Sequence, residues 1–415
     1  MNTNRILKTA SCVAAAAATC GAWAGSKPRP RIDCTTDKSP IAYRCGETAT
    51  FTFSTPDTNG LDLVWTLDGD FGLHAAGTGN VVTATLDRPG FVRVSARTGD
   101  GKWPLAYTAS AGFDIDQLQP ASVLPAGFDA FWDQTRAAVA AVPLNATAEE
   151  VESPTAGVRL YKVKLDTLGS FASGWLSVPQ SADGKQYPAE ATFFGYNGSW
   201  AKDNRARPTS CPGTHILFRV MAHAFELERG DAYYTEVGQA ARSGSYGHGF
   251  DPAQNAKPET SYFHGMLCRD LKAIDYLRTR PEWDGRHLKV SGGSQGALQA
   301  IWMAALADGV TDLSAEVPWN CNLKGPEAGR CAGDWRVPYA PGLDYFDPVF
   351  LARRFPATLR AVIPRAGLGD YVCPPSGVAT FYNAIRCPKK IVWVQGGGHG
   401  GNPIDRRAYE LDSGW

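Results

Sequence analysis

The chain has 415 residues, which is long enough for two domains and a large buried core. Its 41 basic and 41 acidic residues balance, and no basic face of the kind that binds nucleic acid is evident. Beyond residues 1–24, no stretch is apolar enough to span a membrane.

The N-terminus has the pattern of a secretory signal. Two basic residues precede an alanine-rich apolar run from Thr9 to Thr19, and Ala22-Trp23-Ala24 is a small-x-small cleavage pattern. We interpret residues 1–24 as a signal peptide, which predicts export to the periplasm or beyond. The mature net charge is then 39 − 41 = −2. The residues before Cys20 lack the small residue usual beside a lipidated cysteine, which argues against a lipid anchor.

Eight cysteines remain outside that segment, and an even number in an exported protein favours disulfides. Sequence alone does not fix the connectivity. Proximity along the chain favours the pairs Cys34/Cys45, Cys321/Cys331 and Cys373/Cys387, which leaves Cys211/Cys268. We expect no metal site, because no Cys-x-x-Cys or His-x-x-x-His spacing is present.

Residues 25–113 are predicted to form an all-β domain. Four runs alternate apolar and polar residues and are divided by Gly, Pro, Asn and Asp: 48–53, 61–67, 81–86 and 91–96. Short strands at this spacing predict a small immunoglobulin-like β-sandwich with Trp65 as a core anchor. We interpret the domain as a spacer or packing module. The alternative is glycan binding through exposed aromatic side chains.

Residues 114–415 have a different pattern, in which strands alternate with helices after a Gln- and Pro-rich linker at 114–125. The pattern predicts a doubly wound, mostly parallel sheet covered on both faces by helices. Sites in such sheets lie at the C-terminal ends of strands. The strand candidates are 158–165, 174–178, 189–194, 216–220, 288–290, 315–317, 361–363 and 391–394, and helices are expected from Phe128, at 265–278 and at 295–307.

The Gly-x-Ser-x-Gly motif at Gly292–Gly296 follows the strand-like run Leu288–Val290 and opens into an apolar helix from Ala297. A strand, a tight turn and a helix are the context of the nucleophile elbow of α/β-hydrolases. The turn strains the serine backbone, so small residues must flank it. Ser294 is therefore the candidate nucleophile.

A serine hydroxyl needs a neighbouring base to take its proton, and an acid to orient that base. The elbow fold orders these residues as Ser, Asp or Glu, then His. His399 comes after Ser294 in a glycine-rich loop that follows a strand, so we expect it to be the base. Asp370 ends another strand between the two and is the expected acid. Asp344 and Asp347 are rivals whose surroundings are more typical of a turn leading to a helix.

Three segments together resemble the acetyl xylan esterase and cephalosporin C deacetylase family of α/β-hydrolases: Gly292–Gly296, Gly367–Ser376 and Gly398-His399. The resemblance covers roughly residues 120–405 and implies Ser294 as nucleophile, Asp370 as acid and His399 as base. Phe194-Gly-Tyr-Asn-Gly resembles the family's oxyanion loop. The implied oxyanion donors are the backbone amides of Tyr196 and Gln295.

The chain departs from the family pattern at three places, which concern the substrate and the family's ring-shaped oligomer rather than the triad. They are Phe194 before Gly-Tyr, the segment 221–227, and Gly400 after the histidine. Two loops are expected to wall the pocket, through Tyr246, His248, Trp319 and Asn320; ordinary loop and core packing is the alternative for them. The sequence does not specify an oligomeric state.

These residues predict an exported serine esterase that removes O-acetyl groups from xylan or related plant polysaccharides and oligosaccharides. Its partner is then an acetylated carbohydrate, and the Ser-His-Asp chemistry requires no metal or organic cofactor. A serine exopeptidase of the same fold is the alternative enzyme, although Gln295 stands where those peptidases commonly have Tyr. A glycan-binding protein on an inactive hydrolase scaffold is the alternative without catalysis.

Overall fold

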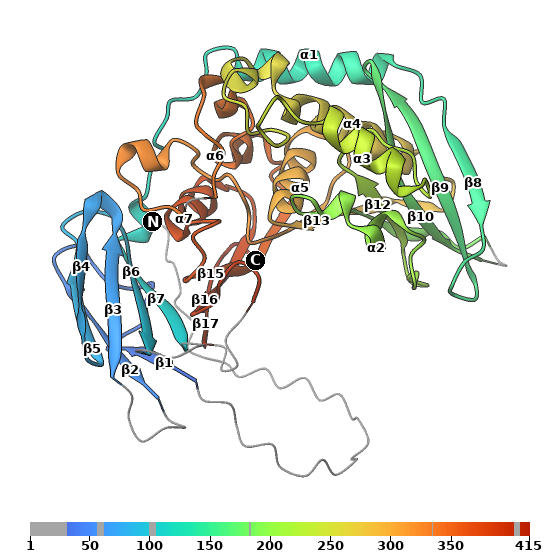
Figure 1. The fold of residues 1–415 in the computed structure, drawn as a ribbon. Coiled ribbons are helices and arrows are strands. Elements are labelled where there is room, and N and C mark those ends of the chain that lie inside the picture. Colours follow the sequence, from blue (N-terminus) through green and yellow to red (C-terminus); the bar gives the residue numbers. More distant parts are fainter. Residues whose placement is uncertain (1–30, 56–61, 99–104, 182–183, 334, 402–406) are drawn as a thin grey trace, which may run out of the picture.

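The computed structural model describes residues 31–55, 62–98, 105–181, 184–333, 335–401 and 407–415 (Figure 1). The predicted signal peptide, residues 1–24, lies outside these ranges. Over the described ranges, no helix combines the length and the apolar character needed to cross a bilayer.

A ten-stranded sheet forms the larger part of the fold, in the order β17-β16-β15-β14-β13-β11-β12-β10-β9-β8. The five pairings from β12 across to β16 are parallel, and the four at the two edges are antiparallel. The predicted mostly parallel sheet is therefore correct for the centre, while the whole sheet is mixed. Its strands are β8 (Thr147–Val151), β9 (Val158–Thr167), β10 (Ser170–Pro179), β11 (Tyr187–Phe193), β12 (Ile216–Met221), β13 (Trp283–Gly293), β14 (Asp312–Glu316), β15 (Arg360–Gly367), β16 (Lys389–Gln395) and β17 (Arg407–Ser413).

Helices pack on this sheet and bury its central strands. The most apolar of them is α5 (Gln295–Leu306), which carries no charged residue and is buried almost all round, as expected of a helix in the core. It contacts β13, β14 and α4. Ser261 caps the N-terminus of α4 by accepting a hydrogen bond from the Phe263 amide. The other helices are α1 (Phe128–Ala141), α2 (Lys202–Arg205), α3 (Asp231–Ala240), α4 (Tyr262–Arg278), α6 (Pro348–Leu351) and α7 (Pro375–Ala384).

The first seven strands form two antiparallel sheets with a shared core, here called the β module. One sheet has the order β1-β2-β5 and the other β4-β3-β6-β7. Phe51, Phe53 and Phe113 are fully buried between them. Trp65, the predicted core anchor, packs against this core with its ring over Gly77 and is partly buried. The strands are β1 (Asp33–Thr36), β2 (Thr48–Ser54), β3 (Leu63–Gly69), β4 (His74–Thr78), β5 (Val81–Thr85), β6 (Gly90–Thr98) and β7 (Ala106–Phe113).

The immunoglobulin-like character of the β module and the domain boundaries at 25–113 and 114–415 stay predictions. The structure adds that the module packs on the end of the large sheet formed by β15, β16 and β17 (Figure 1). The hydroxyl of Ser110 in β7 donates to the carbonyl of Leu368. The backbone N–H and C=O of Ser110 pair with the side-chain amide of Gln395 at 3.1 and 2.8 Å. The Phe91 and Trp393 rings meet with centroids 5.9 Å apart.

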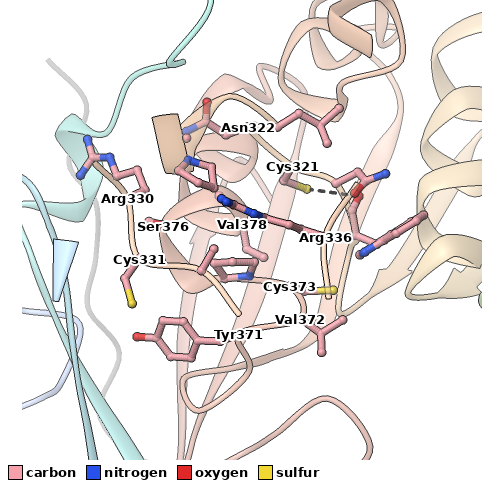
Figure 2. A pocket seen from close by; sticks show the side chains of 18 of the residues that line it. Cys321, Asn322, Arg330, Cys331, Arg336, Tyr371, Val372, Cys373, Ser376 and Val378 are labelled. Atoms are coloured by element: carbon pink, nitrogen blue, oxygen red, sulfur yellow. Dashed lines mark hydrogen bonds between the residues drawn. The ribbon is translucent and has the colours of Figure 1, made fainter. Parts of the chain in front are cut away.

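The prediction of disulfides is wrong in this structure, because all eight described cysteines are free. The thiols point to other partners or lie in different cores. Cys321 donates to the carbonyl of Pro318, and Figure 2 shows its sulfur and that of Cys331 on opposite sides of a small cavity. Cys373 donates to the carbonyl of Val317 at 3.1 Å. The pairs that do not form are Cys34/Cys45, Cys211/Cys268, Cys321/Cys331 and Cys373/Cys387.

Candidate active site

The nucleophile elbow lies between the end of β13 and the start of α5. Ser294 has φ 57° and ψ −121°, a conformation that costs on the order of 1–3 kcal/mol and needs support from its surroundings. The flanking glycines are required by space. A Cβ on Gly292 would overlap the Gly296 carbonyl, and one on Gly296 would overlap the carbonyl of Phe193 in β11. The motif is therefore glycine-rich because the turn is packed against a neighbouring strand.

The three residues predicted for the triad come together. His399 Nε2 lies 3.0 Å from Ser294 Oγ, and His399 Nδ1 lies 3.0 Å from Asp370 Oδ2. Asp370 is 1% exposed, and its other oxygen accepts the amides of Val372 and Cys373, both at 3.0 Å. A carboxylate can only accept, so Nδ1 carries the imidazole proton and Nε2 is left to accept the serine hydroxyl.

The two rival carboxylates serve other contacts. Asp344 accepts the hydroxyls of Ser122 and Tyr339, both at 2.8 Å. Asp347 accepts three backbone amides, those of Asn322, Leu323 and Val349, the last of which caps α6. Both carboxylates are thus occupied in holding loops and a helix end.

A residue that the sequence reasoning missed joins the nucleophile to the base. Arg365 in β15 places its Nε 2.6 Å from Glu316 Oε1, and its two terminal nitrogens donate to the carbonyls of Gly398 and His399 at 3.1 and 3.2 Å. The backbone carbonyl of Glu316 accepts the Ser294 N–H at 3.0 Å. The only signal in the sequence is a charged residue near the C-terminal end of a buried parallel strand, where an apolar residue is the norm.

The two predicted oxyanion residues border Ser294. A Cβ placed on Gly195 would lie 3.7 Å from the Cβ of Ser294, so the loop that follows β11 passes directly beside the serine. Among the described residues, the Tyr196 N–H has no hydrogen-bond acceptor. Gln295 is the first residue of α5, where an N–H has no partner inside the helix. Neither amide N–H has a hydrogen-bond acceptor among the described residues.

Aromatic side chains surround Tyr196. His248 is 6% exposed and stacks on the Tyr196 ring at 4.1 Å, while the buried Trp319 ring lies 6.0 Å away. Trp335, which the sequence reasoning did not select, is closer at 5.0 Å and is 40% exposed. Trp335 lies outside every motif identified in the sequence, so no pattern indicated that it borders the site.

The other two predicted pocket residues lie elsewhere. Tyr246 is largely exposed, outside the lining of the described cavities, and its backbone pairs with Ser243. Asn320 lines a separate cavity of about 50 Å³ behind the loop that follows Asp370, between residues 318–337 and 371–378 (Figure 2). That volume holds a few water molecules and is too small for a sugar ring.

Asp370, Cys373 and His399 could in principle hold a metal, since one ligand atom of each lies within 4.8 Å of the others. These atoms already serve one another, because Nδ1 of the imidazole bonds the carboxylate. Burial raises the pKa of the Cys373 thiol well above its usual range, so the thiolate that a metal requires is disfavoured. The chemistry of this set fits a hydrogen-bonded triad better than a metal centre.

Comparisons with known proteins identify a family. The sequence profile of the acetyl xylan esterase (AXE1) family matches residues 113–325 and 340–409. The acetyl esterase Axe7A of Xylanibacter ruminicola is 27% identical over 320 residues, which cover 74% of this chain and 70% of that protein. Among solved structures, an acetyl xylan esterase from Paenibacillus sp. R4 aligns with a TM-score of 0.57 at 21% identity, covering 70% of this chain and 94% of the other. Acetyl xylan esterase 1 from Thermoanaerobacterium sp. JW/SL YS485 gives 0.57 at 20%, covering 70% and 93%. The family profile leaves the β module almost entirely unmatched.

Proposed function

Because the chain belongs to the acetyl xylan esterase family and is a carboxylic ester hydrolase, we propose that it removes O-acetyl groups from xylan or related plant polysaccharides and oligosaccharides. The proposed mechanism is an acyl-enzyme cycle of Ser294, His399 and Asp370. One observation carries it: the unbroken relay from Ser294 Oγ through the imidazole to the Asp370 carboxylate, with both steps at 3.0 Å.

In the first half of the cycle, Ser294 Oγ attacks the acetyl carbonyl while His399 Nε2 takes the hydroxyl proton. Asp370 stabilises the imidazolium that forms, and its own two amide contacts hold the carboxylate in place. The amides of Tyr196 and Gln295 donate to the developing oxyanion. Preorganised donors of this kind supply on the order of 100-fold or more in rate each.

In the second half, the imidazolium protonates the departing sugar oxygen, which leaves an acetyl-serine. Water then attacks that ester with the same histidine as base, and acetate is released. The predicted signal peptide supports action outside the cytoplasm, where the polysaccharide substrate is found. The exopeptidase alternative has no feature of the site in its favour.

Replacing the nucleophile tests the mechanism. Ser294→Ala is expected to lower the release of acetate from acetylated xylan and of nitrophenol from p-nitrophenyl acetate by at least about 1,000-fold. The exposed Ser210→Ala is the matched control and should keep full activity. Hydrolysis that survives in the Ser294 variant would contradict the proposal. Cleavage of peptide nitroanilides by the wild type in place of acetate esters would favour the exopeptidase.

A further inference from the structure

A wide polar groove of about 640 Å³ opens on the side of Tyr196 that none of the steps above uses. It runs between α2, α3 and the segment 242–248, and Figure 1 shows α2 and α3 together, away from the β module. Both aromatic and polar side chains line it, among them Tyr196, Trp200, Lys202, Arg205, Asp231 and Arg242.

The lining of the groove is cationic, although the chain as a whole is neutral. It has three basic side chains, Lys202, Arg205 and Arg242, against the single carboxylate of Asp231. Arg205 is partly satisfied, because it lies 3.8 Å over the Tyr234 ring and 3.3 Å from Asp231. Lys202 and Arg242 are exposed, and neither forms an ion pair with any residue that the structure describes. Two cations therefore face the solvent of the groove without a counter-charge.

Neighbouring acidic residues do not offset this charge within the groove. Asp203 and Glu236 lie on the same two helices but are not among the lining residues. His248 contributes a neutral ring, since burial, with a smaller effect from Arg242, lowers its pKa to about 4. Its Nε2 is buried and has no hydrogen-bond partner among the described residues.

The groove and the esterase site share the loop that carries Gly195 and Tyr196. The Tyr196 ring lines the groove, whereas the loop residue before it, Gly195, lies against Ser294. A polymer whose acetyl group reaches Ser294 can therefore place its neighbouring units beside Tyr196 and His248. Aromatic rings at Tyr196 and Trp200 with amide and hydroxyl groups between them suit sugar rings, which present apolar C–H faces and polar edges.

We propose that this groove binds the glycan units next to the scissile acetyl ester and selects chains that carry carboxylate groups, that is, uronic acid substituents. Lys202 and Arg242 are the specificity residues, and a sugar carboxylate supplies the counter-charge they lack. The inference rests on the proposed function of Ser294, and it adds a substrate class that the triad does not determine.

The test removes the two charges with the double variant Lys202→Gln and Arg242→Gln. On acetylated xylan that carries glucuronic acid, we expect KM to rise about 10-fold with kcat unchanged, because charge-assisted contacts in an open groove contribute to binding rather than to the reaction. On acetylated xylan without uronic acid and on p-nitrophenyl acetate, the parameters should stay within about 2-fold. The matched control is Lys257→Gln with Arg286→Gln, two exposed cations outside the groove.

Salt gives a second measurement on the wild type, whose KM for the acidic xylan should rise toward that of the variant as ionic strength increases. An equal loss on acidic and neutral xylans, or no change on the acidic one, overturns the inference. Calorimetric titration of Ser294→Ala with a glucuronic-acid-bearing xylo-oligosaccharide separates it from the proposed function. Binding there that is lost with the two cations supports the groove even if the esterase mechanism fails, and no binding overturns it.

Discussion

The Arg365 guanidinium contacts two segments of the chain that lie outside its own strand, β15. One edge of its guanidinium contacts the Glu316 side chain, while the other holds the carbonyls of Gly398 and His399. Glu316 in turn accepts the Ser294 amide through its backbone. The distance between nucleophile and base is thus set partly by a planar, five-donor group that a lysine cannot imitate.

We predict that Arg365→Met lowers kcat for p-nitrophenyl acetate about 10- to 100-fold with little change in KM, the usual scale for losing a group that orients a catalytic residue. Arg365→Lys should recover only part of the loss. Arg360→Met, at the exposed start of the same strand, is the control and should behave as wild type. A fall in kcat that merely follows a fall in folded fraction, measured by circular dichroism, would contradict a positioning role.

At the scale of elements, the elbow shows how closely the start of α5 packs against the strand β11. Gly296, the second residue of α5, lies directly against the Phe193 carbonyl of β11, so that helix, turn and strand leave no room for a methyl group. The helix must approach this closely for the first amides of α5 to lie beside the serine.

Gly296→Ala is expected to displace the start of α5 and lower kcat at least about 100-fold, because a shift of about 1 Å at a reacting group can cost that much. Gly213→Ala is the control and should keep full activity, because an added Cβ meets open space there and the residue does not have a positive φ. Full activity of Gly296→Ala, measured as acetate release, would show that the elbow tolerates a Cβ.

Asp114, the residue that follows β7, ties this end of the β module to the segment between β1 and β2. It accepts from Arg44 at 2.7 Å and from the Cys45 amide at 3.0 Å, and these contacts, the Arg44 one first, lower its pKa to about 2. Because the folded pKa is depressed, the stabilisation is complete above about pH 4 and is lost as pH falls through about 2.

Asp114→Asn should therefore lower the free energy of unfolding by about 1 kcal/mol at pH 7, the scale of a solvent-screened ion pair. The difference from wild type should shrink between pH 4 and pH 2.5. Urea midpoints at several pH values measure it, and Asp87→Asn, at 94% side-chain exposure, is the control. A difference that stays constant over this range would show that the carboxylate charge is not the cause.

At the scale of the whole molecule, the β module is more than a spacer, because it supports the loops that carry the acid and the base. Ser110 holds the carbonyl of Leu368, two residues before Asp370. Gln395 pairs with Ser110 and is the last residue of β16, just ahead of the His399 loop. A buried ion pair between Asp70 and Arg330 at 3.1 Å fixes a second point of contact.

We predict that Gln395→Leu destabilises the protein by about 2–4 kcal/mol, since it leaves the buried N–H and C=O of Ser110 without partners. The exposed Gln119→Leu, whose amide makes only a long contact, should change stability by less than about 0.5 kcal/mol. Chemical denaturation measures both. Equal midpoints for the two variants would mean that the module contributes little to this interface.

The sequence could predict the parts of the site that follow from local order. Ser294, Asp370 and His399 each end a strand of the parallel centre, and such ends meet at one edge of the sheet. Arg365 could not be found in this way, since its partners depend on the register between β14, β15 and the His399 loop. Trp335 could not be predicted either, because it contacts Tyr196 from a segment that shares no motif with it.

The fold, like the site, could be predicted from the sequence only in part. Every predicted central strand is present, because short apolar runs bounded by turn residues are typical of buried parallel strands. The edge strands β8 and β17 were missed, since both are partly or fully exposed and rich in charged residues. The disulfides were wrong because chain proximity does not fix side-chain direction.

The contacts of the β module also set an order for the assembly of the chain. Ser110 meets Leu368 and Gln395 across 258 and 285 residues, and Asp70 meets Arg330 across 260. At about 5–20 residues per second, a ribosome needs roughly 15 to 60 s to make the residues between the members of each pair. During that interval the module's docking face is in water, and closing such long loops is slow. The outer support of the triad loops therefore cannot form before residues 368 and 395 have been made.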